Sequence, residues 1–124
     1  MATSDERYQR GLQVRLKLSG GKQPISPSGG LMPDLDRFAT EACFGDVWAR
    51  PGLEMKLRSL ATISALTVLG REAQLKSHVG YALNLGWKKD ELLELFMHLA
   101  FYGGLPASLA AMRAAGEVFK ERGL

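Results

Sequence analysis

Hydrophobic positions recur every three or four residues along most of this 124-residue chain, which is the spacing of amphipathic α-helices. No segment shows alternating β-branched residues bounded by turn residues, the pattern of a strand. Glycines and prolines interrupt the helical pattern at intervals. We therefore predict an all-α protein of about six helices, at residues 3–18, 33–48, 54–69, 72–85, 88–102 and 106–122.

The first two predicted helices are separated by a long connection rich in glycine, proline and serine, residues 19–33. Loops of that length are uncommon in small domains and often serve function. Thr3 or Ser4 is expected to cap the first helix, which has acidic residues in its first turn. Pro33 suits the first turn of the second helix. The apolar stripe of that helix is Leu35, Phe38, Ala42 and Val47.

The second half of the chain predicts four helices joined by short turns. The helix over 54–69 has little polar surface after its first turn, so we expect it to be central and mostly buried. Gly70 and Gly86 follow helices as terminating glycines. The helix over 88–102 is apolar on more than one face from Leu92 onward. A small domain cannot bury that much apolar surface internally, so we predict oligomerisation through helix faces.

Composition narrows the class of protein. The length suits a single domain over 1–124, with residues 1–32 forming an N-terminal helix and loop and 33–122 a helical core. The polar N-terminus and the single cysteine, Cys43, predict a cytoplasmic protein without disulfides, and no apolar run is long enough to cross a membrane. The net charge of +3 comes from scattered basic residues, which disfavours a nucleic-acid partner and suits a small anionic substrate.

Acid–base chemistry is the remaining candidate once common motifs are excluded. The chain has no HExxH, CxxC, GxSxG or phosphate-binding glycine loop. Glu94 and His98 have helical i, i+4 spacing, which a salt bridge explains more simply than a metal, so we predict no metal site. Arg71, Gln74 and His78 lie on one side of the fourth helix. On spacing alone, His78 is either a partly buried core histidine or a proton-transfer group at the lip of a pocket.

Four motifs in order resemble one known family. They are "CFGDVWARPGL", "RSLAT", "HVGYALNLG" and "LAFYGGLPA", within residues 43–107. The stretch from Phe44 to Val118 resembles the carboxymuconolactone decarboxylase family, whereas residues 1–40 match more loosely and the loop over 19–33 differs from the common type. The resemblance implies an AhpD-like helical bundle that assembles into a ring-like homo-oligomer, with trimers or hexamers common.

The family's thiol-peroxidase branch carries Cys-x-x-Cys-x-x-x-His with a glutamate upstream. Alignment of that histidine on His78 places the two cysteines at Arg71 and Gln74 and the glutamate at Ser59. No thiolate pair is therefore present, and Cys43 lies alone on another segment. A thiol peroxidase is disfavoured.

The decarboxylase branch keeps the histidine and lacks the cysteines, as here. Its implied reaction is loss of CO2 from 4-carboxymuconolactone to give 3-oxoadipate enol-lactone, a step of the β-ketoadipate pathway of aromatic degradation. No cofactor is needed, because the conjugated lactone carbonyl of the substrate accepts the electron pair left by CO2. The protein binds two carboxylates, stabilises an oxyanion and returns one proton to carbon.

The resemblance suggests roles for eight residues. His78 is the expected proton donor, with a reference pKa of about 6.5 that a nearby acid would raise. Glu41 is its expected partner or an alternative acid–base group. Arg50 and Arg58 are expected to bind the substrate carboxylates, with Arg71 in reserve. Trp48 and Tyr102 are expected to form walls of the pocket, and Tyr102 also to donate a hydrogen bond to the lactone carbonyl. His98 is a further expected substrate contact, for which a core or interface position is an equal alternative.

Two other functions stay open. One is a divergent family member that acts on another lactone or β-keto-type acid, because membership fixes the scaffold better than the substrate. The other is a non-enzymatic helical assembly that binds a small ligand or a partner protein.

Overall fold

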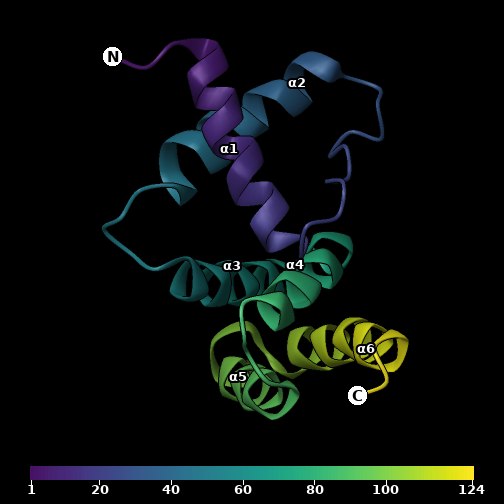
Figure 1. The fold of residues 1–124 in the computed structure, drawn as a ribbon. Helices are drawn as coiled ribbons and strands as arrows, with labels where there is room; N and C mark the ends of the chain where they lie inside the picture. Colours follow the sequence, from purple (N-terminus) through teal and green to yellow (C-terminus); the bar gives the residue numbers. More distant parts are fainter. The chain divides into compact units, whose positions relative to one another are not determined.

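The computed structural model describes residues 1–124 and is entirely helical, with six α-helices, one π-helix and no strand (Figure 1). The all-α prediction is confirmed. The elements are α1 Ser4–Leu18, α2 Pro33–Phe38, η1 Ala39–Trp48, α3 Met55–Leu69, α4 Glu72–Asn84, α5 Lys89–Gly103 and α6 Leu105–Glu121. None of these helices has the length and apolar character needed to span a bilayer.

The chain divides into two compact units, Met1–Met55 and Lys56–Leu124. The first unit holds α1, the long loop, α2 and η1, and the second holds most of α3 together with α4, α5 and α6. The single domain over 1–124, with a core from residue 33, stays a prediction.

In the first unit, α1 packs directly against η1 through two glycines. A Cβ atom on Gly11 would lie 1.9 Å from the Thr40 carbonyl oxygen, and one on Gly45 would lie 2.3 Å from the Arg7 carbonyl oxygen. Backbone therefore meets backbone at this crossing, where any side chain would overlap carbonyl oxygens. Both positions lie within helices, whose backbone conformation any residue can adopt. Glycine is therefore required here because the two backbones approach closely.

Polar contacts fix the same helix pair. The Thr3 hydroxyl accepts a hydrogen bond from the Glu6 backbone N–H at 3.1 Å, which confirms Thr3 as the cap of α1. Arg7 Nε and Nη2 donate to both oxygens of Asp46 at 2.6–3.1 Å. Arg10 Nε donates to the Gly45 carbonyl oxygen at 2.8 Å. The contacts of Arg7 and Arg10 join the first half of α1 to the second half of η1.

The helix predicted over 33–48 is interrupted by a change of winding. Its first six residues form α2, and the next ten form η1, which ends with a hydrogen bond from the Ala49 N–H to the Phe44 carbonyl oxygen, five residues back. The predicted apolar stripe is wrong, because Leu35, Phe38 and Val47 are exposed. The buried face consists of Thr40, Glu41, Gly45 and Trp48. The η1 residues directly beside Gly11 are Thr40 and Gly45, because the approach of the two backbones leaves no room there for large side chains, and Trp48 at the end of η1 is the large apolar residue of this face.

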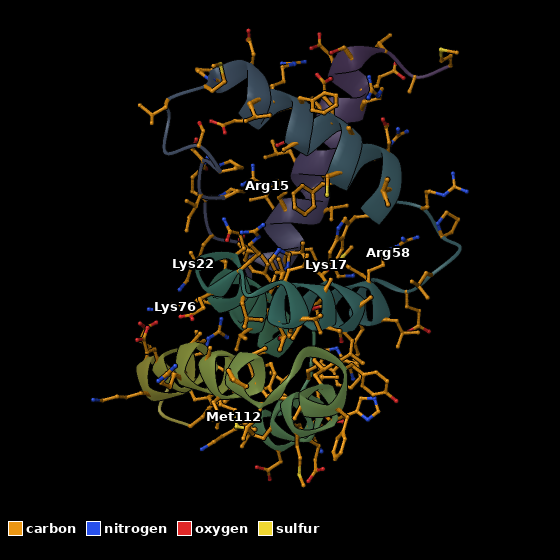
Figure 2. The ribbon with its side chains drawn as sticks, turned by 180° about the vertical axis from the view of Figure 1, so that it is seen from behind. Arg15, Lys17, Lys22, Arg58, Lys76 and Met112 are labelled. Carbon is orange, nitrogen blue, oxygen red and sulfur yellow. The ribbon has the colours of Figure 1, made fainter.

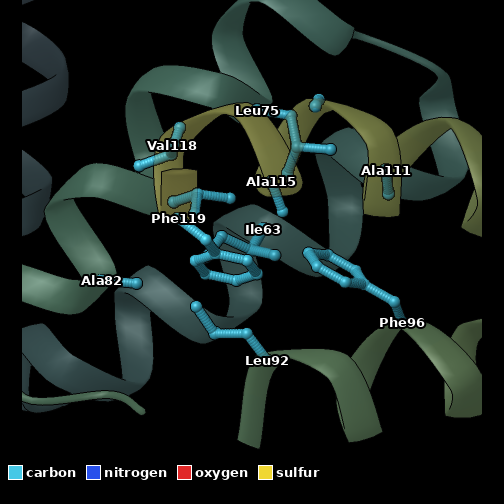
Figure 3. Close-up of a cluster of buried hydrophobic side chains, with 11 residues drawn as sticks. Ile63, Leu75, Ala82, Leu92, Phe96, Ala111, Ala115, Val118 and Phe119 are labelled. Carbon is cyan, nitrogen blue, oxygen red and sulfur yellow. The ribbon is translucent and has the colours of Figure 1, made fainter. Parts of the chain in front are cut away.

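The second unit is built around one hydrophobic cluster (Figure 3). Ile63 of α3 lies among side chains from α5 and α6, including Phe96 and Phe119 (Figure 3). Its buried members are Ile63, Leu75, Val79, Ala82, Leu92, Phe96, Ala111, Ala114, Ala115, Val118 and Phe119. Helix α6 packs against both α4 and α5, so three helices hold the core together.

Helix α3 is less buried than its composition predicts. Its buried residues are Ser59, Ile63 and Thr67, which recur every fourth residue along one stripe. Leu57, Val68 and Leu69 are exposed. Within one chain, therefore, α3 contributes one narrow face to the core. The prediction of a mostly buried helix is wrong because the apolar residues on its other faces have no covering element.

Candidate functional site

His78 lies in the middle of α4, at the edge of the stripe that enters the core. Leu75, Val79 and Ala82 on the same helix are at most 1% exposed, whereas His78 is only partly buried. One and two turns towards the N-terminus, Gln74 and Arg71 are exposed. The polar side of α4 thus runs from solvent towards the core and reaches its most buried position at His78.

Burial determines the protonation state of His78. Removal of the imidazole from water disfavours the charged form and lowers the pKa of His78 from 6.5 to about 4. The sequence-based expectation was the reverse, a pKa raised by a neighbouring acid. No carboxylate contributes to the shift, so the ring is neutral at pH 7.

Tyr81 is a neighbour of His78 that the motif search did not select. The two rings meet edge to face, with centroids 5.1 Å apart and planes at 74°. They are three residues apart on α4, so helical spacing alone was the signal that identifies the pair. Tyr81 therefore packs against one edge of the space around the imidazole.

Glu41 lies on η1 in the first unit, inside a network of donors. Its Oε1 accepts hydrogen bonds from Ser4 Oγ at 2.7 Å and from Arg37 Nε at 2.6 Å, and Arg7 lies 3.8 Å from Oε2. The Ser4 hydroxyl and the Arg37 guanidinium hold the pKa of Glu41 below its usual range. Glu41 is therefore ionised at neutral pH and is itself a contact between α1 and η1.

The three candidate cations lie at helix ends. Arg50 follows η1 and is exposed, and Arg58 is partly buried in the first turn of α3. Arg71 is exposed in the turn between α3 and α4, where its backbone N–H donates to the Leu66 carbonyl oxygen at 2.9 Å. Arg50 belongs to the first unit, and the other two belong to the second.

The candidate aromatic residues differ sharply in exposure. Trp48 is 7% exposed, with its ring centroid 5.9 Å from that of Phe44. Tyr102 is 72% exposed and lies 5.1 Å from the ring of His98, one turn earlier on α5. The structure thus brings His98 and Tyr102 together on an exposed face of the second unit. Their roles in substrate binding stay predictions.

Two buried serines of the second unit add polar groups that sequence reasoning did not select as site residues. The Ser59 hydroxyl on α3 and the Ser108 hydroxyl on α6 are inaccessible and have no hydrogen-bond partner. A buried hydroxyl without a partner costs about 1–3 kcal/mol. Nothing in the sequence marks them, because serine on a buried stripe is ordinary in a small-residue helix contact.

The chain matches the carboxymuconolactone decarboxylase family over residues 33–117. It therefore belongs to this family of helical proteins. The match starts at the first residue of α2 and includes η1 and the whole of α3, α4 and α5.

Individual relatives extend the comparison over nearly the whole chain. The chain is 43% identical to 4-carboxymuconolactone decarboxylase of Acinetobacter baylyi, over 97% of this chain and 92% of that protein. It is 33% identical to nitrosuccinic acid decarboxylase npaB of Metarhizium robertsii, over 90% of this chain and 82% of that one. An uncharacterized 15.0 kDa protein of Paracoccus denitrificans is 39% identical over 73% of this chain and 69% of its own length. With two relatives named as decarboxylases, the chain is a carboxy-lyase.

Proposed function

We propose that this protein decarboxylates 4-carboxymuconolactone to 3-oxoadipate enol-lactone. The observation that carries the proposal is the 43% identity, over 97% of the chain, to a protein of that activity. A partly buried histidine on α4, at the inner end of a polar stripe, supports it from the side of the structure.

The proposed reaction breaks the bond between the ring carbon and the leaving carboxylate. The electron pair passes through the conjugated C=C to the lactone carbonyl oxygen, CO2 departs, and a dienolate remains. One proton then adds to carbon and gives the enol-lactone. The substrate supplies its own electron sink, so the protein has to position carboxylates, stabilise the oxyanion and deliver the proton.

His78 is the proposed proton donor, and its low pKa specifies how it becomes charged. At pH 7 His78 is neutral, so it must first gain a proton before it can act as an imidazolium donor. A substrate with two carboxylates raises the pKa of a nearby histidine, since an opposite charge within about 4–6 Å favours the charged form. Substrate binding is thus proposed to load His78 with the proton that is later transferred to carbon.

Glu41 fits the role of a proton acceptor or charge partner better than that of an acid, because Ser4 and Arg37 keep it ionised. Arg50, Arg58 and Arg71 are the proposed carboxylate ligands, and Trp48, Tyr102 and His98 the remaining substrate contacts. The thiol of Cys43 has a pKa raised by desolvation, which argues further against peroxide chemistry.

A homo-oligomer, such as a trimer or a hexamer, is part of the proposal, as is a cytoplasmic location. The α5–α6 hairpin carries a group of large exposed apolar side chains, namely Met97, Phe101, Tyr102, Leu105 and Leu109. Phe101 alone is 90% exposed. Exposed apolar groups in this number mark contact surfaces more often than free surface.

The test is an assay of the purified protein with 4-carboxymuconolactone, following CO2 release and formation of the enol-lactone. His78→Ala is expected to lower kcat at least about 100-fold, the usual contribution of general acid catalysis. The matched control is Ser77→Ala, an exposed neighbour on the same helix. Wild-type turnover in His78→Ala, with circular dichroism unchanged, would remove His78 from the mechanism.

A second candidate function is decarboxylation of a different small acid. The specific observation is the relative named nitrosuccinic acid decarboxylase, at 33% identity over 90% of the chain. The same assay with nitrosuccinate separates the two, and the substrate with the higher kcat/KM identifies the function. No CO2 from either acid would favour a non-enzymatic assembly.

A further inference from the structure

The first unit contains a pocket of about 380 Å³ that none of the proposed catalytic chemistry uses. It lies between α1, the long loop and the start of the α2–η1 segment, and every residue that lines it belongs to Met1–Met55. None of the eight predicted site residues lines it. Its volume lies within the range of small-molecule sites, about 300–1,000 Å³.

Arg15 gives this pocket an available positive charge. Its Nη1 donates to Thr40 Oγ1 at 3.1 Å and its Nη2 donates to the Ile25 carbonyl oxygen, both uncharged acceptors. No carboxylate forms a salt bridge with Arg15, although the Asp36 carboxylate is close enough to interact with its charge, and the guanidinium lies 5.6 Å from the centroid of the Phe44 ring. Arg37 in the same pocket pairs with Asp5 and Glu41. A guanidinium has five N–H donors, so Arg15 retains donors for an anion after both contacts. Figure 2 shows Arg15 on α1, two residues before Lys17.

The carboxylate of Asp36, the acidic residue of the pocket, already accepts hydrogen bonds from the loop. Its carboxylate accepts hydrogen bonds from Ser26 Oγ at 2.5 Å, from the Ser28 N–H at 2.8 Å and from Ser28 Oγ at 2.8 Å. These donors, together with the nearby charge of Arg15, hold the pKa of Asp36 below its usual range, and they join the loop to α2. The Asp36 carboxylate is therefore engaged within the wall of the pocket, and the partly buried guanidinium of Arg15 is the cation that a ligand would meet.

The remaining walls are flat and mostly apolar. Tyr8 and Leu12 come from α1, and the proline rings come from the loop and the start of α2. The Tyr8 ring is fixed by the Arg37 guanidinium, which lies 4.6 Å from its centroid. Proline and tyrosine rings pack well against a planar ring. The lining prolines are Pro24, Pro27 and Pro33.

From the cavity, the cation and the flat walls, we infer that the first unit binds a small ring-bearing carboxylate at Arg15, separately from the decarboxylation site. The carboxylate accepts hydrogen bonds from Arg15, and the ring lies among Tyr8 and the prolines. Exposed Gln23 at the rim adds a side-chain amide within reach of polar substituents.

The test is isothermal titration of the full-length protein with benzoate, and with benzamide and benzylamine as neutral and cationic analogues. Benzoate is expected to bind saturably and at least about tenfold more tightly than either analogue, since only the anion pairs with Arg15. Arg15→Gln is expected to weaken benzoate about tenfold or more. Lys17→Gln, which removes an exposed cation outside the pocket on the same helix, is expected to leave it unchanged.

Two more variants locate the site and guard against misfolding of Arg15→Gln. Gln23→Trp places a bulky ring at the rim and is expected to block benzoate, because Gln23 is exposed and lines the pocket. His78→Ala is expected to bind benzoate as the wild type does. Loss of benzoate binding in His78→Ala, or binding unaffected by both Gln23→Trp and Arg15→Gln, overturns the inference. So does tighter binding of benzylamine.

Discussion

Acidification should destabilise this protein well above the pH at which its carboxylates are protonated, and His78 is the reason. In the folded chain the pKa of His78 is about 4, against 6.5 for the exposed side chain. Between these values the unfolded chain binds a proton that the folded chain excludes. Stability contributed by neutral His78 is therefore complete above about pH 6.5 and falls as the pH drops towards 4.

The size of the effect follows from the shift. One pKa unit corresponds to 1.36 kcal/mol, so the full effect is about 3 kcal/mol. Over the window from pH 7.5 to pH 5, the expected loss of unfolding free energy from His78 is about 2 kcal/mol. The hydrogen-bonded carboxylates of the first unit have lowered pKa values, so they lose their stabilisation only at more acidic pH.

The assay is urea unfolding followed by circular dichroism at pH 7.5, 6 and 5, at one fixed protein concentration. His78→Gln is expected to flatten the pH dependence, because glutamine does not titrate. His98→Gln, on the exposed face of α5, is the matched control and should keep the wild-type slope. Equal slopes in wild type and His78→Gln would refute burial as the determinant of the charge on His78.

Other predictions follow from packing. Gly11→Ala is expected to lower the unfolding free energy by at least about 3 kcal/mol, since its Cβ would overlap a backbone oxygen. Gly116→Ala, on an open face of α6, should raise it by about 0.5–1 kcal/mol. Thermal melts compare the two variants. Phe96→Ala is expected to cost about 3–5 kcal/mol by urea unfolding. Ser108→Ala should raise stability by about 1 kcal/mol, because it removes a buried hydroxyl that has no partner; a lower melting temperature would contradict this. For the proposed homo-oligomer with the exposed α5 face as its contact surface, Phe101→Asp should lower the mass measured by light scattering and leave the circular dichroism unchanged.

Helix positions could be predicted from the sequence because glycine and proline delimit them. Gly70 and Gly86 end helices with positive φ angles of 72° and 100°, as residues without a Cβ do readily. Pro33 begins α2 as expected. Hydrophobic periodicity did not predict the buried face of η1, because there the contact is made by the backbone and not by side chains. At Gly11 and Gly45 the close approach of two helices reverses which face of η1 is buried, and hydrophobic spacing contains no information on that.

For the candidate site, the sequence predicted which residues to consider, but not their charge states or their hydrogen-bond partners. Spacing placed His78 on α4 beside a buried stripe, and the structure has it there. Its charge state could not be predicted, because desolvation depends on tertiary packing. Nor could the engagement of Glu41 with Ser4, which is 37 residues away in sequence.

Because η1 is wound as a π-helix, its structure depends on the number of residues in the segment as well as on their identity. An α-helix repeats every 3.6 residues, and each residue adds about 100° of rotation. Deletion of one residue between Ala39 and Trp48 would let the segment rewind as an ordinary α-helix, which is narrower than a π-helix, so the close backbone contact of Gly11 with Thr40 and Gly45 would be altered. Single-residue insertions and deletions in this stretch should therefore be rarer among functional variants than substitutions, and a deletion scan would find its least tolerant positions here.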